Sequence, residues 1–251
     1  RPMLGVRCGI AAGADSIEPL LPGAIAFEFI HAFSLVHDDI EDRDEERRGR
    51  PTLWVREGIP HAINTGDALF TISRVATHRL SALGFSDAKV IRMMKIYDET
   101  CLRLCEGQFI DIAASQKNEM QSVEHYFEMI GRKTAALISG GVESAAMLAT
   151  DDEAVITRFR TFGWALGLAF QIIDDILDVE GSAETLGKTA GKDAAQQKPT
   201  YPALYGIDGS RHLAAEAIQR ADDVLAAAAL GNTRLVADRL DEPAYPQTGL
   251  E

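Results

Sequence analysis

The sequence predicts an all-α protein, built as one large helical bundle around a central cavity. Apolar residues recur at three- and four-residue spacing along most of the chain, which is the periodicity of amphipathic helices. Alternation of apolar and polar residues, the pattern of a half-buried strand, is nearly absent. Several of the apolar stretches are long and apolar around much of their circumference, and helices of that kind lie inside large bundles.

The first long helix is expected in the stretch LLPGAIAFEFIHAFSLVHDDIED, because Pro22 suits a first helical turn and about twenty residues then follow without a breaker. We expect Gly49 and Pro51 to end it. Further helices are predicted over residues 61–83, 87–117, 122–149, 151–180 and 209–229. The breaks between them are expected at Gly84, near Asn118, at Thr150–Asp152 and through residues 181–200.

Length and composition indicate a single domain. The chain has 251 residues, of which 46% are hydrophobic, so it can bury a large core, and no Pro/Gly/Ser-rich linker divides it. We therefore expect one domain over residues 1–251. The net charge of -13 argues against a nucleic-acid partner, since phosphate backbones recruit basic surfaces. The chain begins at Arg1 rather than Met, and we expect its N-terminal segment to be missing.

The cysteines and the lengths of the apolar runs indicate where in the cell the protein is expected. Cys8, Cys101 and Cys105 do not form a zinc-binding set, and they are expected to be buried, reduced thiols. Reduced thiols favour a cytoplasmic protein. No uninterrupted apolar run reaches about 18 residues, which predicts that no segment spans a membrane.

The pattern D-D-x-x-D occurs twice, at residues 38–42 and again at 174–178. On a helix the first and last Asp of each set share a face, where like charges destabilise a bare helix by about 0.2–0.5 kcal/mol per pair. A divalent cation would offset that repulsion, and Mg²⁺ prefers carboxylate and phosphate oxygens. The pattern therefore predicts a metal site made by the six aspartates Asp38, Asp39, Asp42, Asp174, Asp175 and Asp178.

One such pattern is weak evidence in an acidic protein, but the two copies lie inside mainly apolar helices. Uncompensated carboxylates in a buried helix would cost several kcal/mol each. Paired across a cavity, the two sets would instead hold a metal cluster. The alternative, in which the aspartates only keep an acidic bundle soluble, remains open on the residues alone.

Other polar residues are aligned with the two motifs. His31 falls on the same helix face as the first aspartates, and Gln171 on the same face as the second. Cations follow each motif or lie inside another apolar helix: Arg47, Arg48, Lys188, Lys192, Lys198 and, beside Thr134, Lys133. Arginine forks and lysine charges around a carboxylate–metal site describe a diphosphate-binding site.

These residues resemble the trans-isoprenyl diphosphate synthases, the polyprenyl synthetase family, from Arg1 to about residue 230. The segments FIHAFSLVHDDIEDRDEERRGRPTLW and GLAFQIIDDILDVEG look like the family's two Asp-rich motifs. INTGDAL, GQFID, YFEMIGRKTAAL and LGKTAGKDAAQQKPTYPAL match in the family's order. The resemblance implies the isoprenoid synthase fold, a homodimer, and head-to-tail condensation of isopentenyl diphosphate with an allylic diphosphate, assisted by Mg²⁺.

The resemblance also implies roles for individual residues. Asp38 and Asp42 would bind two Mg²⁺ ions and Asp174 a third, while Asp39, Asp175 and Asp178 complete or support the site. The allylic diphosphate would contact Arg47, Lys133, Gln171, Lys188 and Lys198, and isopentenyl diphosphate would contact His31 and Arg48. Lys133, Thr134 and Gln171 would face the developing carbocation. The family usually carries a Gly-Lys-Arg segment just before the position of Arg1–Pro2.

Product length is predicted from Phe33 and Ser34, which stand five and four residues before the first Asp. In the family these positions form the floor of the cavity, and five helical residues span about 7.5 Å. An aromatic beside a small residue resembles synthases that make C15 or C20 products, and we favour geranylgeranyl over farnesyl diphosphate. Ordinary core packing of Phe33 is the alternative.

Two rival functions share parts of this pattern. A terpene cyclase shares the fold, but cyclases usually alter the second motif and lack the isopentenyl site, so Asp178, Arg48 and His31 argue against one. A non-catalytic subunit of a heteromeric prenyl synthase tends to lose one aspartate motif. Both motifs are intact here, which favours an active synthase.

Overall fold

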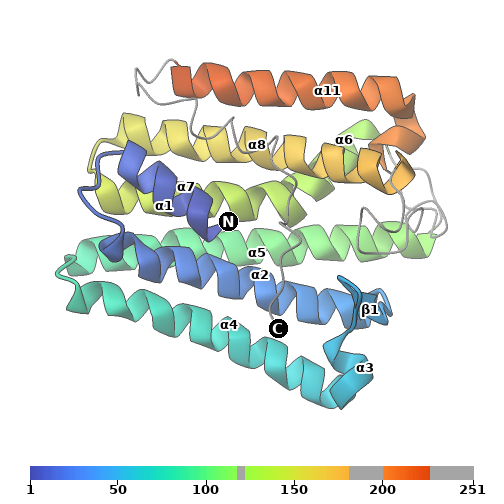
Figure 1. The fold of residues 1–251 in the computed structure, drawn as a ribbon, viewed down its shortest axis with the longest axis horizontal. Helices are drawn as coiled ribbons and strands as arrows, with labels where there is room; N and C mark the ends of the chain where they lie inside the picture. The colour runs from blue at the N-terminus through green and yellow to red at the C-terminus, as the bar shows by residue number, and fades with distance from the viewer. Residues whose placement is uncertain (118–121, 181–199, 227–251) are drawn as a thin grey trace.

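Long helices make up almost all of the chain that the structure describes (Figure 1), which confirms the all-α prediction. The structure is a computed structural model, and it describes residues 1–117, 122–180 and 200–226. The helices are α1 Pro2–Ala11, η1 Glu18–Leu20, α2 Leu21–Glu41, α3 Leu53–Glu57, α4 Ile59–Ala82, α5 Asp87–Lys117, α6 Val123–Ile130, η2 Gly131–Ala135, α7 Ala136–Ala149, α8 Glu153–Glu180 and α11 Tyr201–Ala226. Two short antiparallel strands, β1 Glu46–Arg47 and β2 Arg50–Pro51, form a hairpin.

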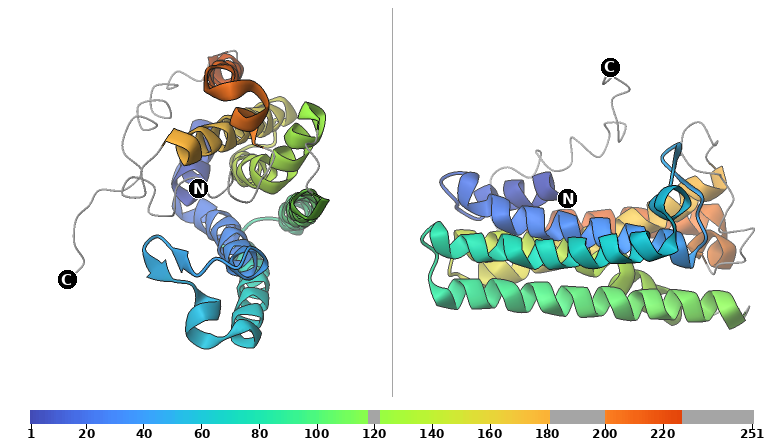
Figure 2. Two further views of the ribbon diagram at one scale, coloured as in Figure 1. Left: turned by 90° about the vertical axis from the view of Figure 1, so that its right-hand side faces the viewer. Right: turned by 90° about the horizontal axis from the view of Figure 1, so that it is seen from below.

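The bundle places the two aspartate motifs at the same end. Helices α2 and α8 run in the same direction in Figure 1, so their C-terminal ends lie together, near β1. Seen along its length in Figure 2, the bundle has α11 packed on α8 at one edge and α4 packed on α2 at the opposite edge. A site between α2 and α8 is therefore supported by a further helix on each side.

The core consists of two clusters of buried side chains. The larger cluster includes Phe27, Tyr97 and Phe162, and the smaller one includes Tyr126 and Ile172. Burying one such side chain stabilises the fold by about 1.5–3 kcal/mol. The larger cluster includes side chains from both α2 and α8, so it fixes the spacing of the helices that carry the aspartates. The smaller cluster packs the C-terminal half of α8 against α6 and α11.

Helix α2 ends earlier than the sequence predicted. We expected Gly49 and Pro51 to end it, but its last residue is Glu41. Arg43 adopts a left-handed backbone with φ of 55°, and the Asp44 amide donates to the Asp39 carbonyl oxygen at 2.8 Å. This is the geometry of a Schellman C-cap, usually built on glycine, and an arginine in that position gave no signal in the sequence. The chain then reverses into the β1–β2 hairpin.

The predicted helix over residues 122–149 is also interrupted. Residues Gly131–Ala135 form a π-helical segment, η2, between α6 and α7. The neighbouring helices approach it very closely: a Cβ atom on Gly107 of α5 would lie 2.3 Å from the Lys133 backbone nitrogen, and one on Gly167 of α8 would lie 2.5 Å from the Ala135 Cα. The two glycines therefore allow α5 and α8 to enclose the π segment, and such segments are frequent at functional sites.

Helix α11, Tyr201–Ala226, is broken at Gly206, whose φ of 71° is not helical. The helical piece after this break agrees with the helix predicted from residue 209, and a shorter piece that was not predicted precedes it. One expectation about the cysteines needs correction. Cys8 and Cys101 are buried as expected, but Cys105 is exposed, since it faces a cavity described below.

Helix length and composition do not confirm the absence of a membrane-spanning segment. Within residues 1–117, 122–180 and 200–226, one helical stretch, Glu18–Glu41, is long and apolar enough to cross a membrane, with a mean hydropathy of 1.5 in its most apolar window. This is weak evidence for a span, because buried core helices pass the same test.

Candidate functional site

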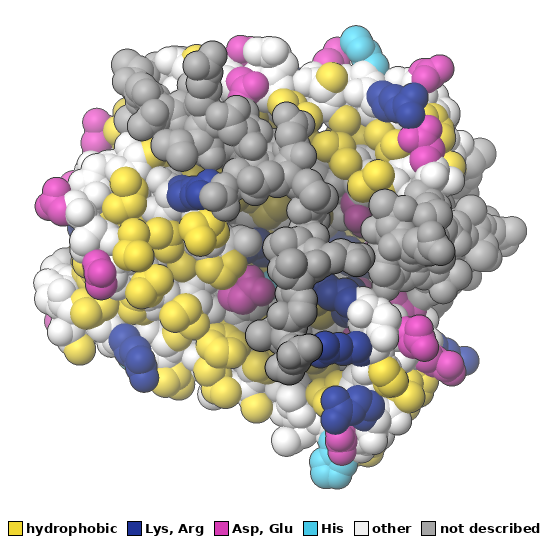
Figure 3. All heavy atoms as spheres, in the orientation of Figure 1, with side chains coloured by type: hydrophobic (Ala, Val, Ile, Leu, Met, Phe, Trp, Pro, Cys, Tyr) yellow, Lys and Arg dark blue, Asp and Glu magenta, His cyan; other side chains and the backbone are white. Residues whose placement is uncertain are grey.

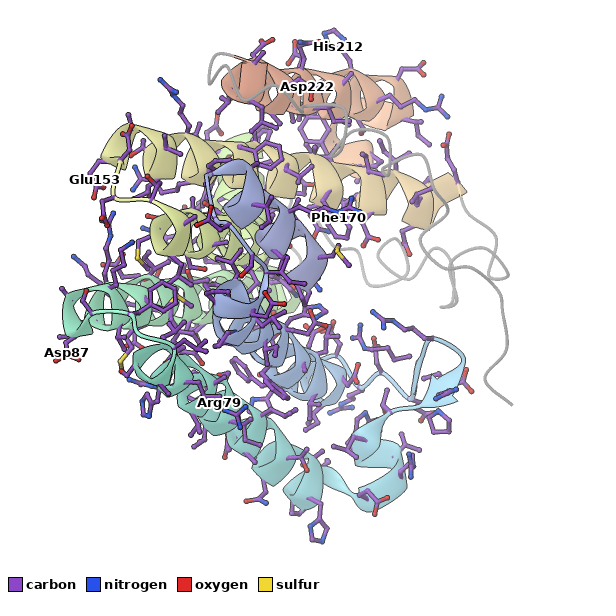
Figure 4. All side chains as sticks on the ribbon, turned by 60° about the vertical axis from the view of Figure 1, so that its left-hand side comes forward. Arg79, Asp87, Glu153, Phe170, His212 and Asp222 are labelled. Atoms are coloured by element: carbon purple, nitrogen blue, oxygen red, sulfur yellow. The ribbon has the colours of Figure 1, made fainter. Side chains whose placement is uncertain are left out.

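A cavity of about 650 Å³ opens at the end of the bundle where the aspartate motifs meet. Figure 3, which views the bundle from the side, shows acidic and basic side chains near the centre of the molecule, beside atoms drawn in grey. Phe170, labelled on α8 in Figure 4, also lines the cavity. The cavity brings together most residues predicted from the sequence: His31, Phe33, Ser34, Asp38, Asp42, Arg47, Arg48, Lys133, Thr134, Gln171, Asp174, Asp175 and Asp178.

A few predicted residues do not line the cavity or cannot be placed. Asp39 is buried beside it, with 6% of its surface exposed. Lys188, Lys192 and Lys198 lie outside the described residues, so their roles remain predictions. The described part of the chain thus supplies the cavity with both aspartate motifs and three of the expected cations.

Cations surround the first motif. The Asp38 carboxylate accepts from Lys133 Nζ at 3.3 Å through one oxygen and from Arg47 Nη2 at 3.3 Å through the other. Arg47 also donates from Nε to Asp39 at 2.6 Å. Because Arg47 stands in the hairpin, the early end of α2 is what turns it back onto the aspartates. The carboxylate of Asp39 therefore orients a cation at the rim of the cavity.

Lys133 is held by carboxylates from two different helices. Its Nζ lies 2.5 Å from an oxygen of Asp111 on α5 as well as 3.3 Å from Asp38 on α2. Burial alone would lower the pKa of Lys133, but the two carboxylates outweigh it and raise that pKa above its ordinary value. Lys133 is therefore a permanent cation, aimed into the cavity by the π segment.

Asp111 is a site residue that sequence reasoning missed. It lies in the segment GQFID, which was matched to the family without a role for any of its residues. Gln108, from the same segment, donates from Nε2 to Asp38 at 3.1 Å and to Glu41 at 2.6 Å. The signal available was their three-residue spacing, which puts Gln108 and Asp111 on one face of α5.

Two neutral side chains donate to Asp175 of the second motif. Asp175 is 4% exposed, and it accepts from the Tyr126 hydroxyl at 2.5 Å and from Gln171 Nε2 at 2.9 Å. The Gln171 carbonyl oxygen accepts in turn from the Thr134 hydroxyl at 2.7 Å. This chain of hydrogen bonds fixes the amide orientation of Gln171 between α8 and the π segment. Asp174, which shares a helix face with Gln171, is half-buried and lines the cavity.

His31 is a neutral imidazole in this site. Burial, followed by the charges of Arg1, Arg48 and Arg47, lowers the pKa of His31 to about 3. Arg1 Nη1 lies 2.8 Å from His31 Nδ1. Since a guanidinium only donates hydrogen bonds, Nδ1 accepts and the ring proton is on Nε2.

The chain matches the family model described as polyprenyl synthetase over residues 1–229. The chain belongs to the polyprenyl synthetase family. Among curated relatives, a short chain isoprenyl diphosphate synthase of Methanothermobacter thermautotrophicus is 34% identical, covering 96% of this chain and 79% of the relative. A relative of the same description from Methanocaldococcus jannaschii is 37% identical, covering 77% of this chain and 57% of the relative. A geranylgeranyl diphosphate synthase of Mycobacterium tuberculosis is 37% identical, covering 86% of this chain and 60% of the relative.

Solved structures show the same fold. A polyprenyl synthase from Caulobacter crescentus, complexed with calcium and isoprenyl diphosphate, has a TM-score of 0.79 and 29% identity, covering 90% of this chain and 77% of that one. A geranylgeranyl pyrophosphate synthetase from Pyrococcus horikoshii has a TM-score of 0.77 and 29% identity, covering 89% of this chain and 78% of that one. The chain thus spans part of the length of its relatives: 57%, 79% and 60% of the three curated proteins above.

The donor chemistry of the cavity fits a hard divalent cation that binds together with a diphosphate. Within the three described ranges, no group of three or more His, Cys, Asp or Glu side chains converges closely enough to hold a metal ion. Mg²⁺, however, is usually held by one or two carboxylates, with substrate phosphates and water filling its remaining positions. Asp38 of α2, Asp42 at the C-cap of α2 and Asp174 of α8 present carboxylates to one cavity in that way.

Proposed function

We propose that this polyprenyl synthetase condenses isopentenyl diphosphate head-to-tail with an allylic diphosphate, forming geranylgeranyl (C20) or farnesyl (C15) diphosphate. The observation that carries the proposal is one continuous cavity with two unlike ends. Its polar end is lined by both aspartate motifs and by cations, and its other end by apolar side chains such as Phe33, Leu104 and Leu137. The descriptions of the relatives support the same reaction and the same range of products.

The polar end suits two diphosphates. Arg47 and Lys133 lie where they can bind the allylic diphosphate, and His31 and Arg48 line the part of the cavity near Arg1 that suits isopentenyl diphosphate. Asp38, Asp42 and Asp174 would hold Mg²⁺, of which we expect three ions, with the other aspartates supporting them. The bound ions would supply Lewis-acid neutralisation of the leaving diphosphate.

The reaction needs no nucleophilic side chain. When the allylic C–O bond breaks, its electron pair leaves with the diphosphate, and the Gln171 carbonyl and Thr134 hydroxyl oxygens face the resulting carbocation. The alkene of isopentenyl diphosphate, held beside it, forms the new C–C bond. A proton is then lost to the departing diphosphate. The apolar wall keeps water away from the cation.

We prefer this function to the two rivals because of what shares the cavity. A terpene cyclase does not bind isopentenyl diphosphate, yet His31 and Arg48 line the same cavity as the aspartates. A non-catalytic subunit does not need two intact aspartate motifs in one cavity. Both features support an active synthase.

We further propose that the protein is a cytoplasmic homodimer. The support is the family resemblance together with large apolar side chains exposed along α5, among them Ile91, Leu102 and Phe109. Such side chains are commonly covered by a partner subunit. Sedimentation equilibrium would test the stoichiometry, and a monomer at micromolar concentration would refute the dimer.

The reaction is tested directly by product analysis. The protein is incubated with Mg²⁺, isopentenyl diphosphate and, in turn, dimethylallyl, geranyl and farnesyl diphosphates, and the chain length of the product is read by chromatography. We expect C20 to dominate over C15. A cyclic hydrocarbon, or no consumption of isopentenyl diphosphate with any primer, would contradict the proposal.

A further inference from the structure

The apolar end of the cavity is walled by two rings from α2. Phe33 and His37 are one helical turn apart, and both line the cavity. Their rings meet edge to face, with centroids 5.7 Å apart. Phe33 stands five residues before Asp38, which is about 7.5 Å along the helix from the first aspartate.

Helix α4 supports both rings with a stripe of residues that had no assigned role. His37 Nε2 lies 3.2 Å from the Ile63 carbonyl oxygen and 3.7 Å from the Asp67 carboxylate. A Cβ atom on Gly66 would lie 2.1 Å from the same nitrogen, so only glycine leaves room for the imidazole. Gly66 and Asp67 belong to the segment INTGDAL, and their contacts account for it physically: they fix His37.

Phe70, one turn further along the same face of α4, supports Phe33. The two rings meet edge to face, with centroids 5.3 Å apart and an angle of 68° between their planes. Phe70 does not line the cavity, so it stands behind Phe33 as seen from the substrate side. Edge-to-face aromatic pairs contribute about 0.5–1.5 kcal/mol beyond their buried area, enough to favour one rotamer of Phe33.

Phe70 is itself held by Tyr97 of α5, at a centroid distance of 6.4 Å. Tyr97 is 1% exposed, and its hydroxyl bonds to Ser73 and, at 3.4 Å, to the Phe70 carbonyl oxygen. The three rings therefore form a stack from the cavity wall into the core, across α2, α4 and α5. Its inner member cannot move without breaking buried hydrogen bonds.

We propose that Phe70 is a specificity-determining residue, which holds the Phe33 ring across the apolar end of the cavity and so limits the length of the prenyl chain. This inference rests on the proposed function and identifies a residue that determines the chain length of the product. When the Phe70 ring is removed, the Phe33 side chain can turn into the vacated space, because the edge-to-face contact that favours its present rotamer is lost. The cavity then lengthens although no cavity-lining residue has changed.

The test compares Phe70→Leu and Phe70→Ala with the unchanged protein in the product assay. A methylene-sized change in an apolar pocket alters discrimination by about tenfold or more, so we expect the ratio of longer to shorter product to rise at least about tenfold. Phe33→Ala, which removes the wall itself, should shift the product in the same direction. Adding Phe70→Ala to Phe33→Ala should shift it little further, since Phe70 acts through Phe33.

The matched control is Phe85→Leu. Phe85 packs against the same core cluster as Phe70 but lies between α4 and α5, away from the cavity. It should lower the melting temperature by a similar amount and leave product length unchanged. A soluble, active Phe70→Leu or Phe70→Ala protein with the original product distribution would overturn the inference, as would an equal shift in Phe85→Leu.

A binding measurement separates this inference from the proposed reaction. Calorimetric affinities for geranyl, farnesyl and geranylgeranyl diphosphates in Mg²⁺ do not require turnover. Phe70→Leu should move the preferred ligand to a longer chain even if the unchanged protein makes no product, which would refute the condensation alone. An unchanged order of affinities in both Phe70 variants would refute the role of Phe70 alone.

Discussion

The two aspartate motifs share one sequence pattern but have different surroundings. In the first, buried Asp39 is bound by the guanidinium of Arg47, at 2.6 Å. In the second, buried Asp175 is bound by a neutral donor, the hydroxyl of Tyr126, at 2.5 Å. The first contact is an ion pair and the second a hydrogen bond between a neutral and a charged group.

Within each motif, the second aspartate differs in its surroundings from the first. Asp38 and Asp174 are half-buried and line the cavity. Asp39 and Asp175 are among the most buried carboxylates in the described chain, although Asp175 also touches the cavity. Removing a cation from a buried carboxylate leaves an uncompensated charge, while removing a neutral donor costs one hydrogen bond. Replacing the first aspartate should therefore lower turnover similarly in the two motifs. Removing the partner of the second aspartate should instead destabilise the fold more in the first motif than in the second.

The largest effect is expected when the cavity-facing aspartates are replaced. Asp38→Ala and Asp174→Ala should each lower kcat by about 100-fold or more, because each removes charge aimed at the reacting diphosphate. The fold should survive in both, as checked by circular dichroism. The control is Asp208→Asn, whose side chain on α11 is fully exposed. Near-normal turnover in either alanine variant would remove that residue from the metal site.

Arg47→Met tests the ionic contact of the first motif. It removes the guanidinium that donates to buried Asp39, and we expect the free energy of unfolding to fall by about 2 kcal/mol. Fully buried pairs cost about 3–5 kcal/mol to break, and the effect is smaller here because a third of Arg47 is exposed to solvent. Urea unfolding measures it. A loss no larger than that of Tyr126→Phe would mean that the two motifs do not differ as described.

The pH dependence of stability measures the lowered pKa of His31, which lies near the cations of the first motif. Its folded pKa is about 3, below the value of 6.5 for an exposed histidine, so acid protonates the unfolded chain first. Stability should therefore fall as pH drops from 6.5 towards 3, by about 1.4 kcal/mol at a pH one unit below 6.5. His31→Gln, neutral throughout, should lack this part of the profile in urea titrations at several pH values. Identical profiles would show that His31 titrates normally.

Tyr126→Phe should have the smallest effect. It removes one hydrogen bond to Asp175 while Gln171 still donates to the other oxygen, so we expect a loss of about 1 kcal/mol in unfolding free energy. Turnover should fall less than in Asp174→Ala, since Tyr126 orients the network rather than the substrate. Inactivation as complete as that of Asp174→Ala, with stability unchanged, would instead make the Tyr126 hydroxyl a direct participant.

Sequence reasoning succeeded where the signal was local and periodic. Helices α4, α5 and α8 have bounds close to those predicted, because long apolar stripes and breakers such as Gly84 are visible in the residues themselves. Most predicted site residues meet in one cavity for the same reason: each motif occupies one face of one helix. The early end of α2 was missed because a left-handed arginine carries no sequence signal.

The remaining site residues were missed because their roles depend on neighbours from distant parts of the chain. Asp111 became a partner of Lys133 only when α5 packed against the π segment. Phe70 became the support of Phe33 only when α4 packed against α2. Neither pairing follows from spacing along a single helix.

The sequence by itself determined the all-α class and the two helix faces that carry carboxylates toward a diphosphate site. Those properties follow from residue type and helical period, which act over a few neighbouring positions. The family was recognised separately, from the resemblance of the motif segments to known synthases. Only the tertiary structure decided which aspartate of each motif faces the cavity, which cation holds it, and which ring supports its apolar wall. These contacts depend on close packing between helices. The absence of a Cβ atom at Gly66, Gly107 and Gly167 lets the helices approach closely enough for the site residues to come into contact.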